Sequence, residues 1–240
     1  MFDPKTKQSS PLLPYGKVAR AGLLYINSEI HRTHDRHVSL GRSQREFMKN
    51  LGFSWGGRDA RRVMRQMEAL AKSQFTLTRI SDNQDGTLVQ SVSSVVASVT
   101  DLWFPLKIEE EGQESLFESS IVVSQDMMEL LETAMPVDLR AWRYLNETSK
   151  SPLVLDVYQW LSERAHRAPK ARGVLITWEQ LRDQFAPDSV ELRSFRRTFL
   201  GALEIVQGVY SANIDIEDQG MRLRYTKAPV MESPSWELPS

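Results

Sequence analysis

The sequence contains no cysteine, only 4 histidines among 240 residues, and no long apolar run. Without cysteine, the chain has no disulfide bonds, cysteine-based zinc sites or thiol nucleophiles. No stretch approaches the roughly 18 apolar residues that span a membrane, and the polar N-terminus lacks the apolar segment of a signal peptide. We therefore expect a cytoplasmic protein with no membrane partner.

The sequence signatures of common enzymes are also missing. Gly16-Lys17-Val18 has the Gly-Lys pair of a phosphate-binding loop, but neither the upstream glycine nor the following Ser or Thr. No Gly-x-Ser-x-Gly, His-Glu-x-x-His or Rossmann glycine pattern occurs. We expect no catalytic residue and no cofactor. A metal-dependent nucleic-acid-processing enzyme that uses carboxylates is the alternative from another functional class.

Three of the histidines, His31, His34 and His37, are spaced by three residues and resemble a metal site. On a helix, however, each such step turns by about 60°, which separates the outer two by roughly 120°. Arg32 and Arg36 would also repel a cation. We interpret these histidines as polar residues at the end of a helix and expect no metal.

The formal net charge of −1 conceals an uneven distribution. Residues 1–80 carry 15 Lys and Arg against 6 Asp and Glu, whereas residues 81–140 carry 2 against 12. Residues 141–240 are balanced, at 13 against 13. A basic region of this kind permits a polyanion partner, although solvated faces also vary in sign by chance.

The first half of the chain has the periodicity of a helix, a short strand, two helices and a hairpin. The predicted elements are, in order, a helix over 18–33, a strand over 37–40, helices over 43–51 and 56–72, and hairpin strands over 75–80 and 87–99. This order describes a winged helix, in which a helix-turn-helix is followed by a β-wing. A further strand within 116–123 and a helix over 125–134 precede Pro136, which we expect at a domain boundary.

The second half repeats this order. The predicted elements are a helix over 152–168, a strand over 174–176, helices over 177–185 and 189–207, and hairpin strands over 213–216 and 221–225. Thr177 followed by Gln180 is a capping-box pattern. At an offset of 135 residues, residues of similar chemistry coincide, such as Tyr25 with Trp160 and Ile26 with Leu161. We predict a helix-rich α+β protein of two tandem winged-helix domains related by internal duplication. Their bounds are 12–135 and 136–227, and 228–240 form a mobile tail.

Arginines line one face of the longer helix in each half. They are Arg58, Arg61, Arg62 and Arg65 in the first half, and Arg193, Arg196 and Arg197 in the second. This spacing places each set on one stripe, opposite apolar residues. In a winged helix, this element enters the major groove, where arginine contacts phosphates or guanine. The alternative is a solvated face. Arg222 and Arg224 share one face of the second hairpin and are candidates for a minor-groove contact.

Spaced motifs in both halves resemble plasmid replication initiators of the RepA type. In the first half they are Leu13-Pro14-Tyr15-Gly16, Glu29-Ile30-His31-Arg32-Thr33, Leu40-Gly41, Phe47-Met48 and Leu51-Gly52. In the second they are residues 151–161, Thr177-Trp178-Glu179-Gln180-Leu181, Phe185, residues 192–197 and Phe199-Leu200. The likeness covers about residues 12–227 and is weakest at the acidic segment 107–118.

This resemblance implies a protein that binds repeated double-stranded DNA sites at a plasmid origin and recruits the host replication initiator and helicase. It also implies winged-helix domains and a switch between dimer and monomer. Strand edges within residues 87–123 are our candidates for a homodimer contact. We thus predict a non-enzymatic initiator of plasmid replication, with a winged-helix transcriptional regulator as the alternative among binding proteins.

Overall fold

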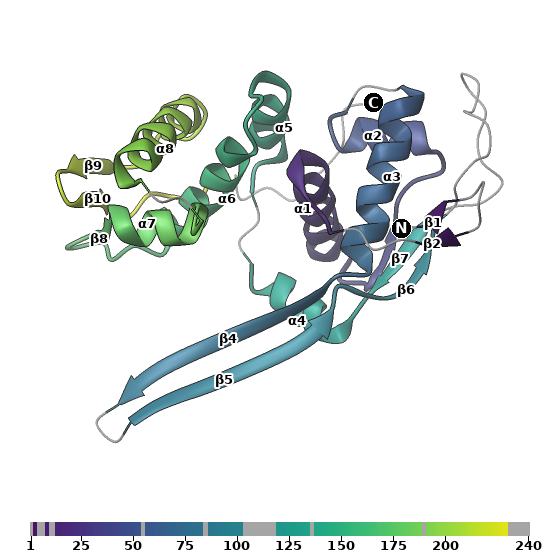
Figure 1. The fold of residues 1–240 in the computed structure, drawn as a ribbon, viewed down its shortest axis with the longest axis horizontal. Coiled ribbons are helices and arrows are strands. Elements are labelled where there is room, and N and C mark those ends of the chain that lie inside the picture. Colours follow the sequence, from purple (N-terminus) through teal and green to yellow (C-terminus); the bar gives the residue numbers. More distant parts are fainter. Residues whose placement is uncertain are drawn as a thin grey trace. The chain divides into compact units, whose positions relative to one another are not determined.

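The computed structural model describes residues 2–3, 8–9, 13–53, 56–83, 86–102, 119–134, 137–188 and 191–229. The chain forms two compact units, Met1–Ala134 and Met135–Ser240 (Figure 1). Helices and small antiparallel sheets make up both units, so the predicted helix-rich α+β class is confirmed. Within the described ranges, no helix has both the length and the apolar character required to cross a membrane.

Unit 1 contains the helices of the first half and most of the β-structure. Its elements are β1 (Phe2–Asp3), β2 (Gln8–Ser9), α1 (Gly16–Thr33), β3 (His37–Ser39), α2 (Gln44–Asn50), α3 (Gly57–Ala71), β4 (Gln74–Asn83), β5 (Gly86–Val95), β6 (Ala97–Asp101), β7 (Ser120–Val123) and α4 (Gln125–Glu132). All three helices predicted between residues 18 and 72 are present, with bounds that differ by one or two residues.

The core of unit 1 forms where α1 packs against α3. Ile26 and Ile30 on α1 are fully buried, as is Met67 on α3. Gly22 permits the close approach, because a Cβ there would stand 2.4 Å from the Met67 sulfur. Helix α2 is capped by Ser43, whose hydroxyl accepts a hydrogen bond from the Glu46 backbone N–H at 3.1 Å. The spacing of apolar residues in the sequence therefore predicts correctly which faces of α1 and α3 are buried.

The β-structure of unit 1 differs from the single predicted hairpin. Strands β4 and β5 pair antiparallel over ten residues each and form a two-stranded ribbon (Figure 1). The strand predicted over 87–99 is not continuous, because buried Val96 interrupts it. The Val96 N–H donates to the Ser73 carbonyl, and its own carbonyl accepts from Ser124. Beyond this break, β6 pairs with β7, which also pairs with β3.

Unit 2 contains α5 (Leu139–Thr148), α6 (Pro152–His166), β8 (Val174–Thr177), α7 (Trp178–Phe185), α8 (Leu192–Gln207), β9 (Ile214–Glu217) and β10 (Gly220–Leu223). The predicted capping box is confirmed, since Thr177 accepts from the Gln180 N–H and the Gln180 side chain accepts from the Thr177 N–H. Helix α5 is missing from the sequence-based prediction. It is capped by Asp138, whose carboxylate accepts from the Arg140 N–H, and it buries Trp142 and Leu145.

The sheet of unit 2 joins the hairpin to the strand between its helices. Strand β10 lies in the middle, paired with β8 on one side and β9 on the other. Gly220 is required at this junction, because a Cβ would meet the Ile176 carbonyl oxygen at 2.2 Å. Met221 and Leu223 on β10 are fully buried. The hairpin therefore closes the core of this unit.

The order of elements recurs in the two units. Helix, strand, helix, helix and hairpin run as α1, β3, α2, α3 and β4–β5 in unit 1, and as α6, β8, α7, α8 and β9–β10 in unit 2. An edge-to-face aromatic contact also recurs between the first and second helices of each set. Tyr25 meets Phe47 at 5.3 Å between ring centroids, and Trp160 meets Phe185 at 5.4 Å.

Candidate nucleic-acid interface

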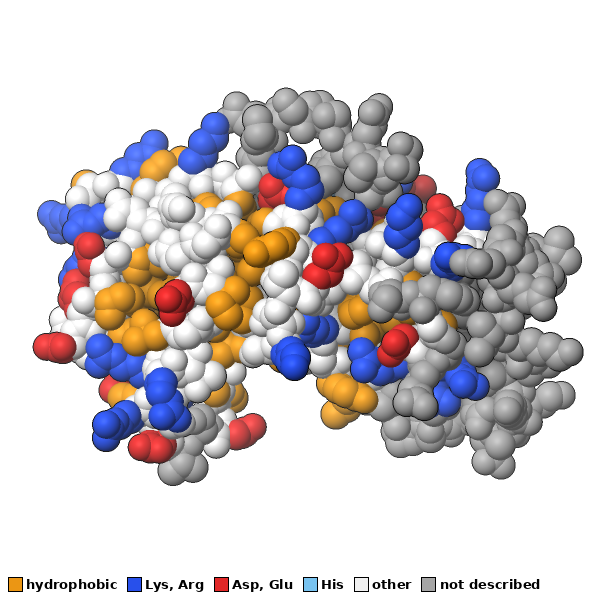
Figure 2. Space-filling model, turned by 90° about the horizontal axis from the view of Figure 1, so that it is seen from above, with side chains coloured by type: hydrophobic (Ala, Val, Ile, Leu, Met, Phe, Trp, Pro, Cys, Tyr) orange, Lys and Arg blue, Asp and Glu red, His pale blue; other side chains and the backbone are white. Residues whose placement is uncertain are grey.

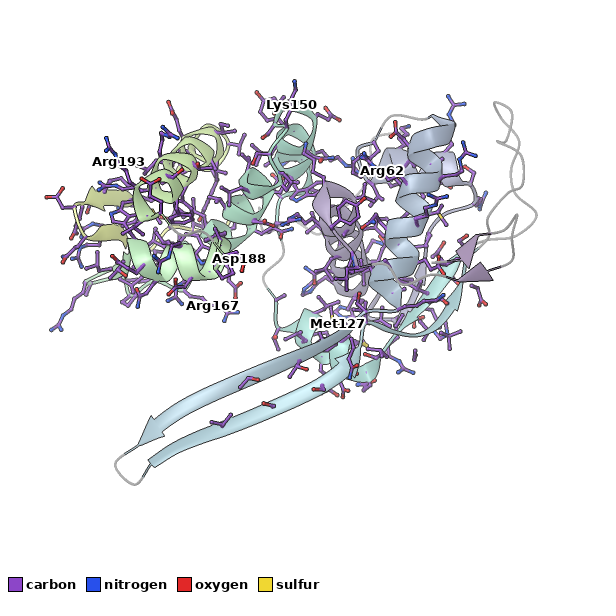
Figure 3. All side chains as sticks on the ribbon, in the orientation of Figure 1. Arg62, Met127, Lys150, Arg167, Asp188 and Arg193 are labelled. Atoms are coloured by element: carbon purple, nitrogen blue, oxygen red, sulfur yellow. The ribbon has the colours of Figure 1, made fainter. Side chains whose placement is uncertain are left out.

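Helix α3 separates an apolar face from a basic one. Ala60, Val63, Met64 and Met67 are at most 4% exposed, whereas Arg61, Arg62 and Arg65 are exposed. Arg62 is labelled on this helix in Figure 3. The backbone of Arg58 lies in the first turn of α3, but its side chain is outside the described ones. The structure thus brings three of the four predicted arginines onto one solvent-facing stripe.

The carboxylates near this stripe do not neutralise it. Glu68 is buried and forms an ion pair at 2.6 Å with Lys72, the residue that follows α3. Asp59 is exposed at the start of the helix. Among the described side chains, none forms a hydrogen bond or ion pair with Arg61, Arg62 or Arg65. Their guanidinium groups therefore face solvent with their full charge, as a phosphate-binding surface requires.

Helix α8 carries the second set of arginines. Arg193, labelled in Figure 3, and Arg197 are exposed. Arg196 is half-buried and lies over the ring of Trp178, 4.6 Å from its centroid. Phe195, Phe199 and Ala202 are buried on the opposite face. The stacking of Arg196 on Trp178 has no signal in the sequence, because it depends on how α7 packs against α8.

The arginines of the β9–β10 hairpin are engaged within the unit. Arg222 forms an ion pair with Glu217 at 2.6 Å, and Arg224 forms one with Asp215 at 2.8 Å. The hydrogen bond from Arg222 holds the pKa of Glu217 below its usual range. Both arginines lie on the same face of the hairpin, but each already has a carboxylate partner across the strands.

Other basic residues of unit 1 lie on α1 and in the segment between α1 and α2. Arg32 pairs with Glu29 one turn earlier, and Arg20 donates to the Gly16 carbonyl at 3.1 Å. Arg42 is exposed in the loop before α2. The face drawn in Figure 2 carries lysine and arginine side chains with acidic side chains interspersed among them.

The three spaced histidines take separate positions. The His31 Nε2 atom lies 3.1 Å from the Ala134 carbonyl oxygen, His34 ends α1 with a left-handed backbone, and His37 pairs with Asp35 at 3.0 Å. Backbone and side-chain hydrogen bonds from His37 lower the pKa of Asp35. In the ranges that the structure covers, no group of three or more His, Asp or Glu side chains is placed to hold a metal ion.

Comparison with solved structures finds similarity to two crystal structures of RctB domains 2 and 3, one of them containing selenomethionine. The identity is 14% in both cases, with TM-scores of 0.48 and 0.49. Each match covers 78% of this chain and 67% or 66% of the RctB chain, so the chain spans about two thirds of each match. No curated protein matches the sequence significantly.

Comparison of the sequence with models of protein families gives a match. The model of a family described as plasmid-encoded RepA protein matches residues 13–180, which is well over half of the chain. This match confirms the resemblance that the spaced motifs indicate. The chain therefore belongs to the plasmid-encoded RepA proteins, a family of non-enzymatic replication initiators.

Proposed function

We propose that this protein initiates plasmid replication by binding repeated double-stranded DNA sites at the plasmid origin, without catalysing a reaction itself. The observation that carries the proposal is the pair of arginine faces on α3 and α8. On α3, Arg61, Arg62 and Arg65 are exposed opposite a buried apolar face, and Arg193 and Arg197 are exposed on α8. Membership of the plasmid-encoded RepA family supports a role in replication for a protein with these basic faces.

In this proposal both units are winged-helix domains, with the bounds 12–135 and 136–227, and they arose by internal duplication. The recurring order of helix, strand, helix, helix and hairpin supports this reading. Helices α3 and α8 then take the place of the recognition helices, which insert their exposed faces into the major groove. The β9–β10 hairpin is the wing of the second domain, with Arg222 and Arg224 directed at the minor groove.

The proposal includes protein partners that the family resemblance implies, namely the host replication initiator and helicase. We assign no residues to these contacts. It also includes a homodimer formed through strand edges within residues 87–123. Strand β6 lies at the edge of the β3–β7–β6 sheet, and β5 pairs with β4 on one side. Residues 103–118 of this segment lie outside the described residues.

Salt-dependent DNA binding tests the central claim. Duplexes that carry the tandem repeats of the plasmid origin are titrated with protein, and fluorescence anisotropy gives the affinity over a range of salt concentrations. The change R61A/R62A removes two exposed charges from α3. We expect it to weaken binding and to reduce the log–log salt slope by about 1.8, or about 0.9 per phosphate contact.

The control variant K150A/R164A removes two exposed positive charges from unit 2 outside both arginine faces and the hairpins. It should leave the salt slope nearly unchanged. An unchanged slope and affinity in R61A/R62A would overturn the assignment of α3.

Footprinting distinguishes a replication initiator from a transcriptional regulator. An initiator protects directly repeated sites at the origin, whereas a transcriptional regulator protects a single palindrome in a promoter.

A further inference from the structure

The three arginines of α8 are held differently. Arg193 and Arg197 extend into solvent, and the described residues offer them no ion pair. The guanidinium of Arg196 lies over the ring of Trp178, with 4.6 Å between its central carbon and the ring centroid. A guanidinium stacked in this way loses much of its rotational freedom but keeps the in-plane N–H donors at its edges.

The ring under Arg196 is itself fixed by several elements. Trp178 is 2% exposed, and its indole N–H donates to the Asp218 carbonyl at 3.0 Å. Its backbone N–H donates to the Gln219 carbonyl, so the first residue of α7 is tied to the turn of the β9–β10 hairpin. Phe199 of α8 contacts the same ring, with 6.5 Å between centroids. Trp178 is therefore a rigid platform where α7, α8 and the hairpin turn meet.

An arginine that recognises a base needs a fixed orientation more than an arginine that binds a phosphate does. A mobile arginine can neutralise a phosphate from many directions, because the attraction is mainly one of charge. A bidentate contact with the O6 and N7 atoms of guanine requires the planar fork to lie in the plane of the base. An arginine whose orientation is fixed before binding also loses less conformational freedom on binding.

We propose that Arg196 reads a guanine in the major groove, with Trp178 as its positioning residue, while Arg193 and Arg197 contact phosphates. This inference rests on the proposed function and deepens it. In unit 1 the residue at the same offset is Arg61, which is exposed. None of the α3 arginines whose side chains are described stacks on an aromatic ring. Unit 2 therefore supplies sequence discrimination at this position, whereas Arg61, Arg62 and Arg65 of α3 supply charge without a fixed orientation.

Selection from a pool of random-sequence DNA duplexes tests whether Arg196 reads a base while Arg193 and Arg197 contact phosphates. The readout is sequencing of the bound fraction. The full-length wild-type chain should enrich a motif that contains at least one strongly preferred guanine. The variant R196K keeps the charge but loses the planar fork. It should reduce the preference at one guanine by about tenfold or more, while the other positions of the motif remain.

The matched control is R197K, the same substitution at the next residue of the same helix, which should leave the motif intact. The variant W178F keeps an aromatic face under Arg196 and should retain the guanine preference, whereas W178L should lose it. Circular dichroism shows whether either Trp178 variant is folded. If W178L fails to fold, R196K and R197K decide the question.

The possible outcomes distinguish failure of the role proposed for Arg196 from failure of the proposed function. An enriched motif that R196K leaves unchanged, or weakens equally at all positions, would overturn the role of Arg196 alone. Loss of a guanine preference in R197K but not in R196K would do the same. If the wild-type chain enriches no motif at all, the proposed function fails, and this inference fails with it.

Discussion

The two units share an order of elements but use their hairpins differently. In unit 2, β10 lies between β8 and β9, and its Met221 and Leu223 are fully buried. In unit 1, β3 pairs with β7 instead of with the hairpin, and β4 and β5 form a two-stranded sheet of their own. A strand from later in the chain therefore takes the place in unit 1 that the hairpin occupies in unit 2.

This exchange leaves several described side chains of the unit 1 ribbon exposed. Val89, Val92 and Val95 of β5 are 59%, 52% and 39% exposed, and the hydroxyl pairs Thr76–Ser93 and Thr78–Ser91 line one face. Burial of an aliphatic side chain contributes about 1.5–3 kcal/mol. The β9–β10 hairpin thus stabilises its unit, whereas the β4–β5 ribbon is a strand pair about 30 Å long, at about 3.3 Å per residue, whose base contacts Ser124 at the start of α4.

The two units also differ in how their arginines are held. On α3, Arg61, Arg62 and Arg65 have no carboxylate partner among the described side chains. On the hairpin of unit 2, Arg222 and Arg224 are each paired with an acidic residue of β9. The exposed charge of α3 is accessible to a polyanion, whereas Arg222 and Arg224 would have to leave these ion pairs to contact one with their full charge.

The largest predicted effect concerns the backbone contact that joins β10 to β8. The change Gly220→Ala would place a Cβ 2.2 Å from the Ile176 carbonyl oxygen, and backbone there cannot move aside as a flexible side chain could. We expect a loss of about 3 kcal/mol in the free energy of unfolding of unit 2. Urea unfolding with hydrogen exchange measured on peptides from each unit tests this, and unit 1 should keep its protection.

Gly201 provides the matched control for this substitution. It lies on the exposed side of α8, and a Cβ there meets nothing within 4 Å. The change Gly201→Ala should raise stability by about 0.5–1 kcal/mol, since alanine favours the helix over glycine. Equal stability of the two variants would contradict the structural role given to the hairpin of unit 2.

A smaller effect is expected from releasing one hairpin arginine. Because Arg222 lowers the pKa of Glu217, the pair is ionised at neutral pH and is lost only as the pH falls through that lowered value. The change Glu217→Gln removes the charge that holds Arg222. We expect tighter DNA binding and a salt slope that is steeper by about 0.9, corresponding to one additional phosphate contact.

Asp218→Asn is the control, because it removes the same charge from the adjacent residue of this hairpin, where the structure describes no ion pair. If both variants bind DNA equally tightly, the loss of one negative charge explains the tighter binding, and the release of Arg222 does not. Anisotropy titrations at several salt concentrations distinguish the two results.

Local features of this fold could be predicted from the sequence. Apolar spacing identifies the buried faces of α1, α3, α6 and α8, and side-chain caps mark where α2 and α7 begin. Arg222 and Arg224 also lie on one face, as the alternation of the strand predicts. These features depend on residues a few positions apart, so the period of the helix or strand is enough to identify them.

Features that depend on distant residues could not be predicted in the same way. The break at Val96 arises because its backbone bonds Ser73 on one side and Ser124 on the other. The pairing of β3 with β7 joins segments about 80 residues apart. The stacking of Arg196 on Trp178 likewise requires α7 and α8 to be packed together. Helix α5 has both a local cap at Asp138 and an apolar face, yet the sequence-based prediction omits it, as it omits the short strands β1 and β2.

The smallest predicted change in stability follows from shortening the ribbon of unit 1. Removal of residues 78–91 and connection of Leu77 to Val92, which are register partners, by an Asn-Gly turn leaves a short hairpin. Because the described side chains removed are exposed, the free energy of unfolding should change by less than about 0.5 kcal/mol. A large loss would show that the ribbon stabilises its unit as the hairpin of unit 2 does.

Light scattering with and without origin DNA tests the homodimer on the same pair of proteins, the wild type and the shortened chain. A dimeric wild type and a monomeric shortened chain would support contact through β5, a dimer in both would favour the edge of β6, and a wild type that is monomeric throughout would contradict the homodimer.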